Sequence, residues 1–157
     1  MNNELKSYLA GIIDGEGYIG IKKMTKKKNR SPYYHERVAI GMTNEQVINL
    51  FHKHFGGYLI YRDHIQSRFN SNHPYWAWEI SDKKAAEFCR FFVDKLIVKK
   101  RQAQFVIKLR ESKERGQIRG RDGFLIKSLL DEREKLYQAI IDIHGRKRSD
   151  YWKASTL

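Results

Sequence analysis

The chain has 157 residues, and its 31 lysines and arginines outnumber its 18 aspartates and glutamates, which gives a formal net charge of +13. A chain of this length is expected to form one domain with an independent core. With 41% hydrophobic and 13% aromatic residues, it is too apolar for a disordered basic tail. Cys89 is the only cysteine, which excludes a disulfide framework and a cysteine-based zinc finger.

The N-terminal segment lacks the charged and then apolar pattern of a secretory signal. No apolar stretch approaches the roughly 20 residues that cross a bilayer. We therefore expect an intracellular protein, in the cytoplasm or an organelle matrix, with no membrane partner.

Three segments carry most of the excess positive charge. Seven basic residues lie between Lys22 and Arg37, nine lie between Lys99 and Arg121, and four more follow from Arg146 onwards. Three basic clusters interleaved with Tyr, His and Asn are more typical of a surface that contacts phosphates than of a solvated basic face. An anionic membrane is a weaker alternative, because no strongly apolar helix face accompanies the basic runs.

The spacing of apolar residues changes between helical and alternating patterns along the chain. The expected elements are a helix at 5–13, strands at 18–24 and 33–43, a helix at 44–55, strands at 58–63 and 75–81, and helices at 83–96, 99–115 and 122–144. This α-β-β-α-β-β-α order, followed by C-terminal helices, predicts an α+β fold with a four-stranded antiparallel sheet. The helices would cover one face of the sheet and leave the other open and polar.

The first helix carries a row of small residues. Ser7, Gly11 and Gly15 are spaced by four, so they share one helix face without side-chain bulk. Such a face suits a second copy of the same helix across a two-fold axis. Two copies would place their Glu16 carboxylates side by side, an arrangement that favours Mg²⁺. The predicted interface residues are Ser7, Ala10, Gly11, Asp14 and Gly15.

Residues 9–17 read Leu-Ala-Gly-Ile-Ile-Asp-Gly-Glu-Gly, which resembles the signature of the LAGLIDADG homing endonucleases. Ile12, Gly15 and Glu16 depart from that signature. The order of the predicted elements also matches the family's fold, so the resemblance covers nearly the whole chain: one domain over 1–157, with a folded core at 1–145 and a basic tail at 146–157.

The resemblance also implies site residues. Glu16 and the carbonyl of Gly15 would bind Mg²⁺ or another divalent cation such as Mn²⁺, and Asn44 would orient water. Lys99 would lie near the scissile phosphate, although Lys100 and Arg101 are close enough to take that place. A helix N-cap is an equally good interpretation of Asn44. Asp14 belongs to the motif as a helix-end or interface group.

Strand alternation then predicts the side chains that face DNA. Arginine fits the two major-groove acceptors of guanine, whereas the lysines at 22–30 are expected to contact phosphates. Trp76 and Trp78 fall on the opposite face and are expected in the core. The predicted DNA-binding residues are Lys22, Met24, Lys26, Lys28, Arg30, His35, Arg37, Arg62, Tyr75 and Glu79.

A single copy of the motif implies a homodimer. The resemblance thus implies an intron-encoded or similarly encoded, sequence-specific endonuclease that hydrolyses phosphodiesters of double-stranded DNA at a long pseudo-palindromic site. The alternatives are a non-cleaving nucleic-acid-binding protein, such as an intron RNA maturase or a DNA-binding regulator, and a generic RNA-binding domain.

Overall fold

The computed structural model describes residues 1–24, 31–63, 74–116 and 124–145. The elements follow the predicted order: α1 (Asn3–Glu16), β1 (Gly17–Met24), β2 (Tyr33–Met42), α2 (Glu45–Phe55), β3 (Tyr58–Arg62), β4 (Tyr75–Ser81), α3 (Asp82–Phe92), α4 (Lys100–Glu114) and α5 (Lys127–Ile143). The predicted α+β class is confirmed.

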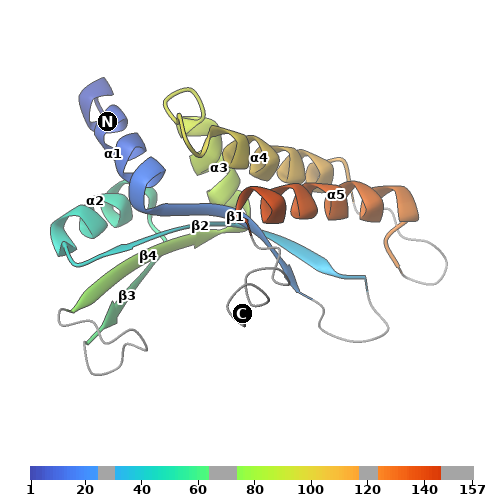
Figure 1. The fold of residues 1–157 in the computed structure, drawn as a ribbon, viewed down its shortest axis with the longest axis horizontal. Helices are drawn as coiled ribbons and strands as arrows, with labels where there is room; N and C mark the ends of the chain where they lie inside the picture. Colours follow the sequence, from blue (N-terminus) through green and yellow to red (C-terminus); the bar gives the residue numbers. More distant parts are fainter. Residues whose placement is uncertain (25–30, 64–73, 117–123, 146–157) are drawn as a thin grey trace, which may run out of the picture.

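The four strands form one antiparallel sheet in the order β1-β2-β4-β3. Figure 1 shows the described helices gathered over one face of this sheet. The expected two-layer arrangement is therefore correct for the described part of the chain. None of the helices in these described ranges is long and apolar enough to span a membrane.

Three helix boundaries differ from the sequence prediction. The first helix continues to Glu16, because Gly15 keeps helical geometry and the N–H of Gly17 still bonds to the carbonyl of Ile13. The third helix ends at Phe92, whose carbonyl accepts from two N–H groups in the turn that follows. The last helix begins at Lys127, since Leu125 is held outside it by the hydroxyl of Ser31.

The core lies between the helices and one face of the sheet. Trp78 of β4 is fully buried, as predicted, and its ring centroid lies 5.2 Å from that of Phe51 and 5.5 Å from that of Phe88. Its indole N–H donates to the carbonyl of Gly56 at 2.6 Å. Trp76, two residues earlier, is only partly buried against this core. The alternation along β4 thus separates core side chains from those of the open face.

One charged residue lies on the core face. Glu36 of β2 is fully buried and forms ion pairs with Lys113 at 2.5 Å and Arg110 at 2.9 Å, both from α4. A buried carboxylate is stable only when it is paired. These contacts therefore attach α4 to the sheet by charge as well as by apolar packing.

Replacing Trp78 by alanine is expected to lower the free energy of unfolding by about 3–5 kcal/mol, because the change opens a core cavity and leaves the Gly56 carbonyl without its donor. Urea denaturation measures this loss. The control is Tyr61→Ala, which removes an aromatic ring from the exposed edge strand and should cost much less. Equal losses in the two variants would contradict the placement of Trp78 at the centre of the core.

Candidate functional site

Asp14, in the last turn of α1, connects this helix to the start of α4. Its carboxylate accepts hydrogen bonds from the backbone N–H groups of Ile97 at 2.7 Å, Val98 at 3.2 Å and Lys99 at 2.9 Å. A carboxylate in this position satisfies the N–H groups of the turn that leads into α4, and its negative charge lies near the positive end of the α4 dipole. Asp14 is therefore a helix-end group within the protomer, and its place in a dimer interface remains a prediction.

The side chain of Lys99 also binds Asp14. Its ammonium group donates to the backbone carbonyl of Asp14. Burial lowers the pKa of the Lys99 ammonium, while the negative charges of Asp14 and Glu16 act in the opposite direction. The structure thus brings Asp14, Glu16 and Lys99 together. Lys100 and Arg101 are exposed on α4. Of these three consecutive basic residues, Lys99 is therefore the one that contacts the motif, through Asp14.

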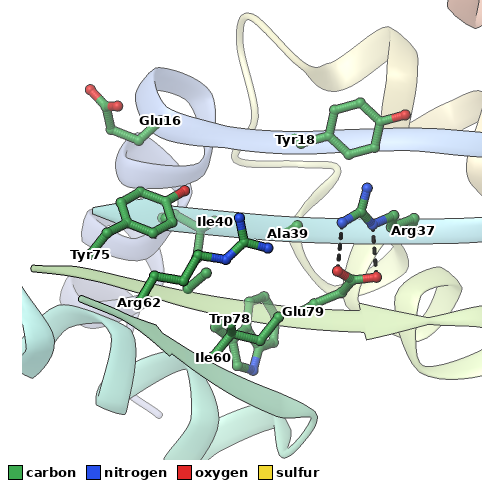
Figure 2. A pocket seen from close by; sticks show the side chains of 12 residues that line it. Glu16, Tyr18, Arg37, Ala39, Ile40, Ile60, Arg62, Tyr75, Trp78 and Glu79 are labelled. Carbon is green, nitrogen blue, oxygen red and sulfur yellow. Dashed lines mark hydrogen bonds and ion pairs between the residues drawn. The ribbon is translucent and has the colours of Figure 1, made fainter. Parts of the chain in front are cut away.

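Glu16 is the last residue of α1 and lies at one end of a groove on the open face of the sheet. It is exposed, and its carboxylate forms no hydrogen bond or ion pair within the described ranges. Figure 2 shows Glu16 above this groove, with side chains that the four strands contribute. The open-face lining residues are Tyr18, Arg37, Ala39, Gly41, Ile60, Arg62, Tyr75, Ala77 and Glu79.

Two tyrosines lie flat against the strands of this face. A Cβ atom on Gly41 would lie 1.6 Å from the hydroxyl of Tyr75, and one on Gly20 would lie 2.3 Å from the hydroxyl of Tyr18. Only glycine allows so close an approach of a ring to the backbone. Tyr75 is a predicted residue of this face. Tyr18 is not, although its place in the strand alternation, two residues before Gly20, is a signal for the same face.

Arg37 and Glu79 are bound to each other. The sequence predicts them as separate DNA contacts. Arg37 donates through Nε to Oε1 of Glu79 at 2.7 Å and through Nη2 to Oε2 at 2.6 Å. The hydrogen bonds to Glu79 raise the pKa of the Arg37 guanidinium above its ordinary value. The guanidinium also lies 5.7 Å from the ring centroid of Tyr18.

Of the other predicted contact residues, Lys22, Met24 and His35 lie on the strands of the same face. Lys22 is exposed on β1, and Met24 is partly exposed at the end of that strand. His35 lies 3.1 Å from a carboxylate oxygen of Asp82, away from the groove. Lys26, Lys28 and Arg30 lie outside the described residues.

Asn44 is the N-cap of α2. Its side-chain oxygen accepts a hydrogen bond from the backbone N–H of Val47 at 3.2 Å. The structural interpretation of Asn44 is therefore confirmed, because this bond satisfies one of the free N–H groups of the helix. A role in orienting water remains a prediction.

The row of small residues on α1 is exposed to solvent, but one residue predicted in the interface is buried. Ser7, Gly11 and Gly15 are exposed, and a Cβ atom on either glycine would meet nothing within 4 Å. Ala10, predicted in the interface, is only 2% exposed and belongs to the core with Ile13. That prediction is wrong, because Ala10 lies on the helix side that faces the sheet.

A divalent cation would find oxygen donors at the end of α1, but few of them. The Glu16 carboxylate is exposed, and the carbonyl of Gly15 lies in the last turn, where helix carbonyls lack intrahelical partners. The described ranges contain no group of three or more His, Cys, Asp or Glu residues that could hold a metal ion. One protomer therefore fits a cation only in part, and the Glu16 of a second copy would add another carboxylate.

Replacing Asp14 by alanine is expected to lower the free energy of unfolding by about 1–2 kcal/mol, because it removes the acceptor for three N–H groups before α4. Asp14→Asn keeps one carbonyl oxygen and should give a smaller loss. Chemical denaturation of both variants checks this order. Unchanged stability of the alanine variant would show that the cap contributes nothing to folding.

No protein-family model and no curated protein sequence matches the chain, but solved structures do. The homing endonuclease I-CvuI in complex with DNA has 14% identity and a TM-score of 0.67, over 89% of this chain and 82% of that chain. The archaeal intron-encoded homing endonuclease I-Vdi141I complexed with DNA has 18% identity and a TM-score of 0.63, over 87% and 84%.

The LAGLIDADG homing endonuclease I-GzeII in complex with its DNA target has 13% identity and a TM-score of 0.59. That alignment covers 90% of this chain but 44% of the other. The present chain thus corresponds in length to less than half of I-GzeII and to most of I-CvuI. The chain has the fold of the LAGLIDADG homing endonucleases.

Proposed function

We propose that this protein is a homodimeric, sequence-specific endonuclease that hydrolyses phosphodiesters of double-stranded DNA with Mg²⁺ or Mn²⁺. The observation that carries the proposal is the position of Glu16. Its carboxylate has no hydrogen bond or ion pair among the residues that the structure describes, and it lies at the end of a bare helix ridge, on the edge of an open sheet face. A homing role, as an intron-encoded or similarly encoded protein, accompanies this activity.

DNA binding is supported by the open face and its charge. The chain carries a net charge of +13, and Lys22, Arg37 and Arg62 lie on the face without helices. Cations on such a face contact phosphates and supply affinity, while side chains in the groove can reach base edges. The solved structures of I-CvuI and I-Vdi141I are complexes with DNA.

A homodimer is supported by two features of the surface and by one alignment. The ridge of Ser7, Gly11 and Gly15 is exposed and has room for a second helix. Ile97 and Val98, whose N–H groups bond to Asp14, are 86% and 68% exposed. Adjacent apolar side chains beside a bare ridge favour burial against another copy. The alignment to less than half of I-GzeII agrees with a chain that needs a partner.

The proposed catalytic residues are Glu16, Lys99 and Asn44. Glu16 and the Gly15 carbonyl would hold the cation, which supplies Lewis-acid stabilisation of charge on the phosphate. Lys99, held by the Asp14 carbonyl next to Glu16, would place a positive charge near the scissile phosphate. Asn44 would orient water through the donor side of its amide, since its oxygen caps α2.

Selection on a randomised duplex library, with and without Mg²⁺, tests the function directly. Glu16→Gln should reduce cleavage at least ~100-fold while binding persists, because the amide keeps the shape but loses the charge that holds the cation. A gel-shift assay measures binding, and product formation measures cutting. Loss of both would make Glu16 structural, and a wild-type chain that binds without cutting would favour the non-cleaving alternative.

Gly11→Leu should convert the dimer to a monomer. The new side chain meets open space in one protomer and raises helix propensity, so the fold should persist. In a dimer the same side chain would hold the two ridges apart. Sedimentation analysis measures the mass, and Ser7→Ala, which keeps the ridge bare, is the control. An unchanged dimer mass for Gly11→Leu would refute the ridge as the interface.

A further inference from the structure

The geometry of the Arg37–Glu79 pair leaves part of the guanidinium unused. Glu79 binds the side edge of Arg37, through Nε and Nη2. A guanidinium has five N–H donors, so Nη1 and the second hydrogen of Nη2 are not used by this pair. These two nitrogens form the end edge of the group, which can donate two parallel hydrogen bonds to one planar acceptor pair.

The sheet register explains how this pair forms. Tyr18 and Glu79 are both cross-strand partners of Ala39, on its two sides. Arg37 is two residues before Ala39 on the same face of β2, so it can reach both neighbours diagonally. The small side chain of Ala39 leaves room between them. Figure 2 shows Arg37 bonded to Glu79, with Tyr18 on the neighbouring strand.

A long arginine side chain on a solvated surface samples many rotamers, and fixing it carries an entropic cost. In this structure Arg37 loses that rotamer freedom when the protein folds. Two short hydrogen bonds to Glu79 and the Tyr18 ring, 5.7 Å away, restrict its guanidinium. Arg37 is also only partly exposed. The group is thus ordered before any ligand binds, and Arg37 lines the same groove as Glu16 and Arg62.

We infer that Glu79 is a positioning residue, which holds Arg37 so that its end edge donates to O6 and N7 of one guanine in the major groove. This inference rests on the proposed function. Glu79 itself does not contact the base. In a two-fold dimer, the pair specifies one guanine in each half of the target, at symmetric positions.

This role predicts an effect that a merely structural role would not produce. Without Glu79, Arg37 is free to move to the nearest phosphate, so sequence preference falls while affinity for non-target DNA does not. The protein also loses one negative charge on its binding face. The slope of log K against log salt should then steepen by up to about 0.9 for each added phosphate contact.

The experiment compares base preferences of four proteins: wild type, Glu79→Leu, Glu79→Gln and Arg37→Ala. Each is selected on a randomised duplex library with Ca²⁺ in place of Mg²⁺, and the bound duplexes are sequenced. A bidentate arginine contact should give the wild type about 5- to 150-fold preference for guanine at one position per half-site. Arg37→Ala and Glu79→Leu should lose that preference at that position, and Glu79→Gln should keep part of it.

Lys22→Ala is the matched control. Lys22 is a basic residue of the same face, proposed to contact phosphate, so its variant should keep every base preference and make the salt slope shallower. If Glu79→Leu has the same base preferences as the wild type, the positioning role is overturned. It is also overturned if Glu79→Leu loses base preference equally at all positions. Failure of the wild type to prefer any base overturns sequence-specific binding as well. Guanine preference without cleavage in Mg²⁺ overturns only the endonuclease activity.

Discussion

The arrangement of the site depends on one carboxylate. Asp14 accepts three backbone N–H groups from residues 97–99, and the ammonium of Lys99 binds the carbonyl of the same Asp14. These bonds fix the last turn of α1 against the start of α4. Glu16, two residues later, is thereby directed to the open side of the sheet. The bare ridge of the helix stays exposed because Leu9, Ala10 and Ile13 on its other side face the core.

The two-residue period of the strands provides the second constraint. It places Trp78 in the core and its neighbour Glu79 in the groove, so each strand contributes to the core on one face and to the groove on the other. Arg37 and Glu36 show the same separation on β2. Glu36 is paired beneath the sheet with α4, whereas Arg37 is paired above it with Glu79. The charges of the core side attach a helix, and those of the open side would form the DNA-binding surface under the proposed function.

Local patterns in the sequence predict the order of the elements and the sheet face on which each strand residue lies. They also predict that Glu16 lies where the first helix ends. They do not predict contacts that depend on which strands become neighbours. The Arg37–Glu79 pair forms because β2 and β4 are adjacent, and the cap joins Asp14 to residues more than 80 positions away. Ala10 was misplaced for a related reason. Small size suggested a helix contact, whereas the sheet beneath α1 decides which small residue is buried.

The proposed function requires that two copies bring their Glu16 carboxylates to a shared cation site over DNA. Anomalous diffraction from a Mn²⁺-soaked crystal of the protein with a selected duplex tests this most directly. We expect manganese peaks within direct coordination distance of Glu16, with one Glu16 supplied by each protomer and the duplex against the open faces. Peaks that involve no Glu16, or a dimer that holds the two Glu16 side chains far apart, would contradict it.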